Sequence, residues 1–321
     1  MANGNARDSS ATSAAVVRTA PPVREKRIKV CVRLRPFTKN EAVKAGGKAA
    51  WTWHENTIYQ QIFPAQIPIR RLTGDKKSGG STTSSSVGST HPDSATLPSS
   101  YSFDYLYPPM STTHEVYEET VKDAITGAMD GYHSSVFLYG QTGTGKTYTM
   151  QGTKTDPGIV QLSVQDIFNH VASHPDMEFL LRFSYLEIYN ERIYDLLAAG
   201  AKAEVKIYEV SRNNTNSSNS NSNSNSNNSR DSSSSGPVKD VVIKGLREEI
   251  VVTMEHVLSL VEVGNQHRHM ATTESNDQSS RSHVIFRMVI ESQHKRSRDR
   301  NLNAPARSAT LNLIDLAGSE S

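Results

Sequence analysis

The eight residues from position 140 to position 147 have the composition and spacing of a phosphate-binding loop. They are Gly140, Gln141, Thr142, Gly143, Thr144, Gly145, Lys146 and Thr147, and they match the pattern G-x-x-x-x-G-K-[ST] at every position. Glycines let successive backbone N–H groups converge on phosphate oxygens, because no side chain stands in the way. Lys146 supplies a positive charge for the terminal phosphates, and the Thr147 hydroxyl suits Mg²⁺, a hard cation that prefers oxygen. An accidental glycine-rich turn is the alternative interpretation.

An acidic residue follows a predicted strand near the end of the sequence. Asp315 comes directly after Leu-Asn-Leu-Ile, where a carboxylate would hold the water shell of Mg²⁺. Gly318 lies three residues further on, and we expect its N–H to be free to approach a γ-phosphate. Alone, Asp315 is more typical of a strand-end residue that caps a turn. Beside a complete phosphate loop, the metal-site interpretation is favoured.

A third segment, Asn276–His283, is rich in short hydroxyl side chains. It reads Asn-Asp-Gln-Ser-Ser-Arg-Ser-His and is followed at once by Val-Ile-Phe. Serine hydroxyls cannot form a core, but they can ligate Mg²⁺, bond phosphate oxygens and position water. A solvated serine-rich loop is the alternative, and the apolar residues that follow argue against it because they anchor the segment to a strand.

Taken together, these segments resemble the kinesin motor domain family. Gly140–Thr147, Asn276–His283 and Asp315–Glu320 (D-L-A-G-S-E) occur in the family's order. A further family signature is Ser184–Leu197, which reads S-Y-L-E-I-Y-N-E-R-I-Y-D-L-L. Myosins share the general design, but their two corresponding loops read S-S-R-F-G and D-I-x-G-F-E. The stretch 239–293 looks most like the centromere-protein-E type of kinesin.

The resemblance implies roles for residues in the two switch segments, Asn276–His283 and Asp315–Glu320. Ser279 and Ser280 would contact the γ-phosphate and Mg²⁺ and help to position the attacking water. Arg281 and Glu320 would form the salt bridge that closes the two segments around ATP. The predicted catalytic residues are Ser279, Ser280, Arg281, Gly318 and Glu320, and the predicted metal ligands are Thr147, Ser280 and Asp315.

The resemblance also implies an adenine site and a partner. Arg33, Arg35 and Pro36 belong to an R-x-R-P motif that would flank the adenine, with Tyr148 against the ring. The implied cofactors are ATP and Mg²⁺, and the implied reaction is phosphoryl transfer to water, in which catalysis is mostly positioning and charge stabilisation. The implied partner is the microtubule, and the implied location is the cytoplasm and its cytoskeleton, including the spindle.

The elements that must position these residues are predicted from hydrophobic periodicity. Alternating strands and helices indicate an α/β fold: a central mixed β-sheet flanked by helices, a P-loop NTPase of the kinesin and myosin type. Strands are predicted at Ile28–Arg35, with Ile28, Val30, Val32 and Leu34 on one face, at 51–62, at Ser135–Tyr139, which should be buried, and at Phe179–Tyr189, Val205–Val210, Val238–Ile243, Val284–Ile290 and Ala309–Ile314. Helices are predicted after the Thr112–Glu115 capping box, at Glu191–Leu197, and at Thr253–Val263 with Gly264 just past its end.

Composition excludes several classes of protein. The 321 residues carry a net charge of +2, which indicates no strongly charged partner such as a nucleic acid. Cys31 is the only cysteine, so an intrachain disulfide scaffold is excluded. The sequence has neither an apolar run of membrane-span length nor a signal-peptide pattern, so we expect neither an integral membrane protein nor a secreted one. His267, Arg268 and His269 have no further ligands at metal-site spacing, and we assign them to a helix-terminal surface.

The chain divides into a tail and one domain. We expect residues 1–26 to be a disordered N-terminal tail and residues 27–321 to form a kinesin motor domain with low-complexity inserts at 78–100 and 211–236. In the second insert, 21 of the 26 residues are Ser or Asn, too few apolar groups to offset the cost of ordering the chain.

The resemblance implies a motor domain that is incomplete after the second switch segment, which leaves the activity of such a chain open. A nucleotide-binding but non-motile fragment, a passive tubulin-binding module and a nonfunctional translation product are the alternatives. Direction of movement, cargo and oligomeric state are not predicted.

Overall fold

The computed structural model describes residues 28–46, 48–61, 99–198, 203–211, 239–270, 280–295 and 306–320. The predicted tail over 1–26 and nearly all of the two predicted inserts, 78–100 and 211–236, lie outside these residues.

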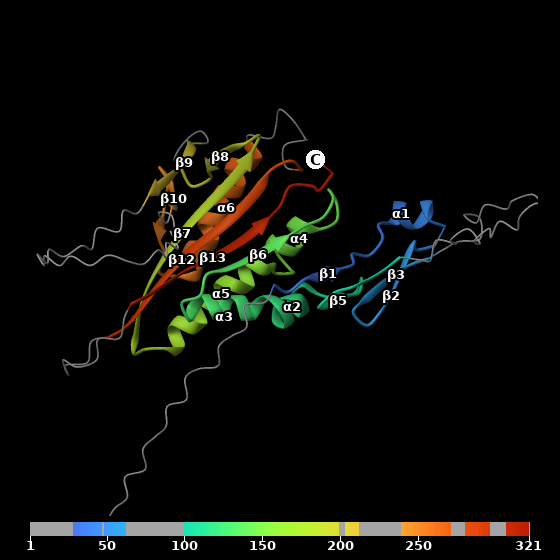
Figure 1. The fold of residues 1–321 in the computed structure, drawn as a ribbon, viewed down its shortest axis with the longest axis horizontal. Helices are drawn as coiled ribbons and strands as arrows, with labels where there is room; N and C mark the ends of the chain where they lie inside the picture. Colours follow the sequence, from blue (N-terminus) through green and yellow to red (C-terminus); the bar gives the residue numbers. More distant parts are fainter. Residues whose placement is uncertain are drawn as a thin grey trace, which may run out of the picture.

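A mixed β-sheet forms the centre of the fold (Figure 1). Its strands are β6 (Ser134–Leu138), β7 (Met177–Tyr189), β8 (Arg192–Asp195), β9 (Ala203–Ser211), β10 (Lys239–Lys244), β11 (Glu249–Ile250), β12 (His283–His294) and β13 (Arg307–Asp315). The strand order is β10-β9-β8-β7-β12-β13-β6, and β11 pairs with β7 outside this path. β6 is parallel to β13 and the other pairs are antiparallel, so the predicted mixed sheet is confirmed.

Two smaller sheets lie beside the central one (Figure 1). β1 (Cys31–Arg33) is parallel to β5 (Tyr105–Tyr107), while β2 (Trp51–His54), β3 (Thr57–Gln60) and β4 (Ser100–Ser102) form an antiparallel sheet near the short helix α1 (Lys39–Lys44). The strand predicted over Ile28–Arg35 is shorter than expected, and the predicted apolar face is wrong at its start, because Ile28 is 86% exposed. The reason is that β1 has only the three residues of β5 to pair with.

Four helices pack along one face of the central sheet. They are α3 (Lys122–Met129), α4 (Lys146–Gln151), α5 (Ile159–Ser173) and α6 (Met254–Met270). α3 is preceded by α2 (Thr113–Val116) and a π-helical turn, η2 (Tyr117–Val121). The predicted capping box is confirmed, because Thr112 Oγ1 accepts the Glu115 N–H at 3.2 Å and the Glu115 carboxylate accepts the Thr112 N–H at 2.8 Å.

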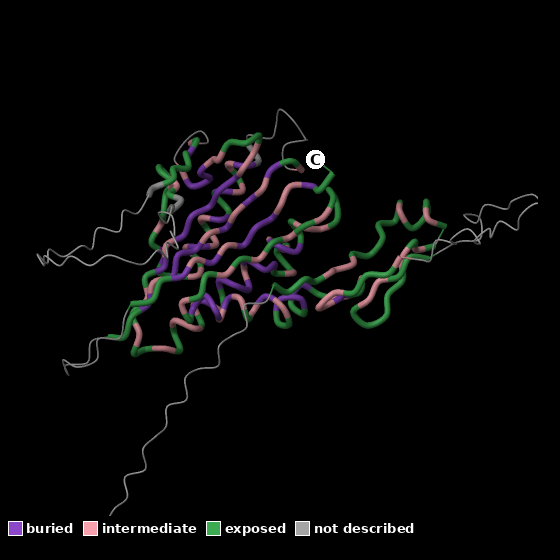
Figure 2. The backbone as a smooth tube through the Cα atoms, viewed as in Figure 1, coloured by how far each residue is buried: buried purple, intermediate pink, exposed green. Residues whose placement is uncertain are grey.

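Buried residues follow the central strands and the helices that cover them (Figure 2), and the core lies where these two layers meet. Leu181, Phe183 and Tyr185 alternate along β7 and are buried against the helices. The prediction that Ser135–Tyr139 is a buried strand is wrong, because Phe137 on the opposite face is 60% exposed. Among the described residues, β6 is an edge strand that pairs only with β13, so its outer face lacks neighbours.

Two of the predicted helices differ from the structure. The helix predicted at Glu191–Leu197 is wrong, because β8 forms there as the second strand of a hairpin with β7. Asn190 and Glu191 both have positive φ, which gives the tight turn that reverses the chain.

The helix predicted at Thr253–Val263 does not end at Gly264 but continues to Met270. A Cβ at Gly264 would lie 2.3 Å from Tyr185 Cδ1, so this glycine allows the close approach of α6 to β7.

Candidate nucleotide-binding site

The sheet register places the phosphate loop beside the second switch segment. Leu138, the last residue of β6, pairs with Asp315, the last residue of β13. Beyond these strands the two chains stay together, because the Leu316 N–H donates to the Leu138 carbonyl at 3.2 Å and the Ser319 N–H donates to the Gly140 carbonyl at 3.1 Å. The parallel pairing of two distant strands therefore brings the two motifs into one site.

The loop between β6 and α4 has the backbone conformation that its glycines permit. Gly143 and Gly145 have φ values of +78° and +96°, which side chains strongly disfavour. Gly145 leads directly into α4, which begins at Lys146. Most of the loop is exposed to solvent, so its backbone is accessible to a ligand.

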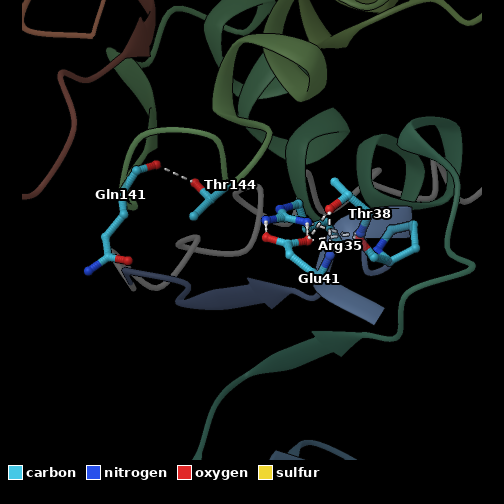
Figure 3. Close-up of polar contacts among 6 residues, drawn as sticks. Arg35, Thr38, Glu41, Gln141 and Thr144 are labelled. Carbon is cyan, nitrogen blue, oxygen red and sulfur yellow. Dashed lines mark hydrogen bonds and ion pairs between the residues drawn. The ribbon is translucent and has the colours of Figure 1, made fainter. Parts of the chain in front are cut away.

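Two side chains of the loop fold back onto its own carbonyl groups. Lys146 Nζ donates to the carbonyls of Gly140 and Gln141 at 2.8 and 3.0 Å. Thr144 Oγ1 also donates to the Gln141 carbonyl, at 2.8 Å (Figure 3). The Lys146 ammonium thus lies over the loop, where phosphate oxygens offer it a stronger acceptor than neutral carbonyls.

Thr147 and Asp315 form the contact expected of a magnesium site. Thr147 Oγ1 donates to Asp315 Oδ2 at 2.6 Å, and Asp315 is only 4% exposed. The other carboxylate oxygen, Oδ1, is buried and has no hydrogen-bond partner among the described residues. Burial raises the pKa of Asp315 above its ordinary value, while the Thr147 hydrogen bond acts in the opposite direction.

These groups fit Mg²⁺ because an orphaned carboxylate oxygen and a hydroxyl are oxygen donors. Within the described part of the chain, no three His, Cys, Asp or Glu residues form a metal cluster. The usual protein site for Mg²⁺ combines one or two protein oxygens with phosphate and water, and Thr147 and Asp315 supply such oxygens.

The two switch segments are bonded to each other in the structure. The Gly318 N–H donates to the Ser280 carbonyl at 2.7 Å, and the Ala317 N–H donates to His283 Nδ1 at 3.1 Å. The expectation of a free Gly318 N–H is therefore not met, because the first switch segment supplies its acceptor. Ser279 lies outside the described residues.

Glu320 contacts the phosphate loop. Its carboxylate accepts the Thr142 N–H at 3.0 Å and also the Thr142 hydroxyl. These hydrogen bonds, that of the hydroxyl foremost, lower the pKa of Glu320. The Arg281–Glu320 bridge stays a prediction.

On the predicted adenine side, Arg33 and Arg35 behave differently. Arg33 lies 5.7 Å from the centre of the Tyr148 ring and donates to Thr149 Oγ1 at 2.9 Å, so it is near the phosphate-loop helix. Arg35 instead turns toward Glu41 and forms two hydrogen bonds of 2.6 and 2.7 Å with its carboxylate (Figure 3). It also donates to the carbonyl of Pro36. The adenine roles of these residues stay predictions.

Comparison with known proteins agrees with this geometry. A family model described as "Kinesin motor domain" matches residues 33–321. The chain belongs to the kinesin motor domain family. Kinesin-related protein 11 of Dictyostelium discoideum is 44% identical over 226 residues, which are 69% of this chain and 29% of that protein. Human Centromere-associated protein E is 34% identical over 294 residues, which are 91% of this chain and 9% of that protein.

A solved kinesin has the same fold. The structure titled "Structure of a fast kinesin: Implications for ATPase mechanism and interactions with microtubules" has a TM-score of 0.65 and 28% identity, and the match covers 92% of this chain and 66% of that one. This chain thus spans only part of the kinesins it matches. Among its described helices, none has the length and apolar character needed to cross a membrane.

Sequence reasoning missed one group of residues in this kinesin. Arg268, assigned above to a helix-terminal surface, is 8% exposed, so that prediction is wrong. Its guanidinium donates to Glu187 on β7 and to Ser282 in the first switch segment. The available signal was Glu187 itself, because period-two alternation places it on the same inward face as Phe183 and Tyr185, where a carboxylate needs a cation.

Proposed function

We propose that this chain is an ATP-dependent microtubule motor domain that binds and hydrolyses Mg·ATP at Gly140–Thr147. One observation carries the proposal. Thr147 is bonded to one oxygen of the buried Asp315 carboxylate, and the other oxygen has no partner among the described residues. A phosphate loop, a hydroxyl and an unsatisfied carboxylate oxygen in one site are what a magnesium-bound nucleoside triphosphate requires.

The loop residues have separate tasks in binding. Lys146 exchanges its two carbonyl acceptors for the terminal phosphates of ATP, and the exposed backbone of the loop receives the other phosphate oxygens. Thr147 and Asp315 would hold Mg²⁺ together with Ser280. When bound, the ion neutralises part of the charge on the phosphate oxygens.

Hydrolysis depends on the two switch segments. Ser279 and Ser280 position the attacking water, and the bond from Gly318 to the Ser280 carbonyl keeps the second segment against the first. With ATP bound, an Arg281–Glu320 salt bridge would hold the two segments closed, and the Gly318 N–H would turn from the Ser280 carbonyl to the γ-phosphate. Because phosphoryl transfer involves little covalent chemistry by the protein, this positioning supplies most of the catalysis.

The adenine and the partner follow from the family. Arg33 supplies a cation and Tyr148 on α4 supplies an exposed ring, groups that suit a planar base, and Arg35 and Pro36 would complete that side. We infer microtubules as the partner and the microtubule cytoskeleton of the cytoplasm, the spindle included, as the location. A non-motile nucleotide-binding fragment is less favoured, because the family match covers residues 33–321.

The test is steady-state phosphate release from ATP in the presence of Mg²⁺, with Asp315→Asn as the variant. Asparagine keeps the shape of the side chain but removes the charge, so we expect release to fall about 100-fold. Asp123→Asn is the matched control, since this exposed carboxylate bonds Lys29 away from the site, and it should keep the wild-type rate.

The same preparations test the partner. Wild-type protein should co-sediment with polymerised tubulin, to different extents with ADP and with a non-hydrolysable ATP analogue. Wild-type protein that neither releases phosphate nor sediments with tubulin would overturn the proposed function.

A further inference from the structure

The last turn of α6 carries a guanidinium group that is almost wholly buried. Arg268 Nε donates to Glu187 Oε1 at 3.4 Å, and Arg268 Nη2 donates to Ser282 Oγ at 3.0 Å. Glu187 is 0% exposed. A buried ion pair is often no more stabilising than apolar side chains of similar volume, because both charges lose their water. Stability alone therefore does not account for this pair.

Glu187 lies in a row of residues that crosses the central sheet to the nucleotide site. It pairs with Val284 on β12, Val284 pairs with Asp315 on β13, and Asp315 pairs with Leu138 on β6. Residues that pair directly across strands point to the same face of the sheet. The ion pair and the Asp315 carboxylate are therefore on the same face, the one that α6 covers.

Ser282 links the ion pair to the first switch segment. It is buried and immediately precedes His283, where β12 begins. Two residues earlier, Ser280 accepts the Gly318 N–H, and one residue later, His283 accepts the Ala317 N–H. Arg268 and the second switch segment thus hold the same short stretch, Ser280–His283.

We propose that Arg268 is a positioning residue for ATP hydrolysis, which fixes through Ser282 the point where the first switch segment joins β12. The inference rests on the proposed function. Arg268 acts through Ser282 on Ser280, and Glu187 holds the guanidinium in place for that task. If the contact is lost, Ser280 moves relative to the phosphate loop, and a misplacement of about 1 Å can cost about 100-fold in rate.

The expected signature is a loss of turnover without a matching loss of nucleotide binding. Binding depends mainly on the loop Gly140–Thr147, whereas the serine segment acts in the chemical step. Loss of a residue with only a structural role would instead lower thermal stability, turnover and nucleotide affinity together.

Two variants test the proposal without stranding the Glu187 charge. Ser282→Ala removes the hydroxyl and leaves the ion pair, and Arg268→Lys keeps the positive charge but loses the forked geometry that reaches two acceptors. Both should lower kcat for phosphate release about tenfold or more. Both should leave the dissociation constant of a fluorescent ATP analogue within about twofold of wild type.

The matched control is Arg182→Lys. Arg182 lies on β7, the strand that carries Glu187, and pairs with Glu248 and Glu291, so Arg182→Lys makes the same chemical change in an ion pair outside Ser280–His283. The control should keep the wild-type kcat. Thermal unfolding of all the variants, followed by circular dichroism, identifies any loss of rate that comes from unfolding.

Amide hydrogen exchange supplies a measurement that does not need hydrolysis. Ser282→Ala should lower the protection of a peptide that covers residues 280–290, and Arg182→Lys should not. The positioning role would be overturned if Ser282→Ala and Arg268→Lys both kept the wild-type kcat and the wild-type protection of this peptide. It would also be overturned if Arg182→Lys lowered kcat and protection as much as they do. If the wild-type protein itself does not hydrolyse ATP, the proposed function fails, and exchange alone then decides whether Arg268 holds this stretch.

Discussion

At the scale of single residues, chemistry made some positions predictable and left others hidden. Thr147 and Asp315 are 168 residues apart in the chain, yet their oxygens are 2.6 Å apart. Both could be predicted because phosphate and Mg²⁺ chemistry restricts which residue types occur in their motifs. Arg268 could not, because His-Arg-His at the end of a helix has the composition of a solvated surface. Alternation along β7 indicates that Glu187 needs a cation, but only the fold shows that the cation is Arg268 on α6.

A prediction at this scale concerns the charge pair near the predicted adenine site. The hydrogen bonds from Arg35, and then that from the Thr38 N–H, lower the pKa of Glu41 to about 2. A lowered pKa means that the carboxylate supports the cap of α1 above its unfolded-state pKa, and that this support is lost as the pH falls through about 2. Arg35→Met should therefore raise the pKa of Glu41 toward its ordinary value, measured by NMR titration of the carboxyl carbon.

The control for this titration is Lys39→Met, because Lys39 is exposed on the same short helix. It should leave the pKa of Glu41 nearly unchanged. A Glu41 that titrates at its ordinary value in the wild-type protein would show that Arg35 does not pair with it in solution.

At the scale of elements, apolar periodicity located most strands and failed where turn geometry decided the outcome. β7, β12 and β13 lie where the alternation predicted them, but β7 begins two residues earlier and β12 and β13 extend at both ends, because the sheet also pairs residues that are not apolar. β8 was hidden because its turn residues, Asn190 and Glu191, do not form a recognised hairpin dipeptide. The continuation of α6 through Gly264 could not be predicted, because this glycine makes room for the Tyr185 ring, which lies on β7.

The hairpin turn gives a prediction at the element scale. Glu191 has a φ of +60°. This conformation is unfavourable for a residue with a Cβ atom, and glycine adopts it without that cost. Glu191→Gly should therefore raise the free energy of unfolding by about 0.5–1 kcal/mol, measured by urea denaturation, because Asn-Gly is the preferred type I′ turn.

Asn190→Ala is the companion variant, and it should lower the stability because alanine disfavours positive φ. A lower stability for Glu191→Gly would show that the turn differs from this one in solution.

At the scale of the whole molecule, fold class was predictable and strand order was not. Alternating strands and helices indicated an α/β fold with a mixed sheet, and the hairpins from β7 to β10 follow the chain order. The decisive neighbour of β6, however, is β13, whose Asn312 bonds Ser135 across 177 residues of sequence. That pairing brings Leu138 against Asp315 and makes one site from two distant motifs.

The central claim is that Gly140–Thr147 and Asp315 form one site for magnesium-bound nucleotide, and titration of a fluorescent ATP analogue tests it most directly. Lys146→Ala removes the charge for the terminal phosphates and leaves the loop backbone, whereas Lys122→Ala removes a half-buried lysine that bonds Glu118 one helical turn away. We expect tight binding in Mg²⁺ for wild type and Lys122→Ala, weaker binding when Mg²⁺ is chelated, and loss of most of the affinity in Lys146→Ala. Equal affinity in Lys146→Ala and wild type would show that this loop is not the nucleotide site.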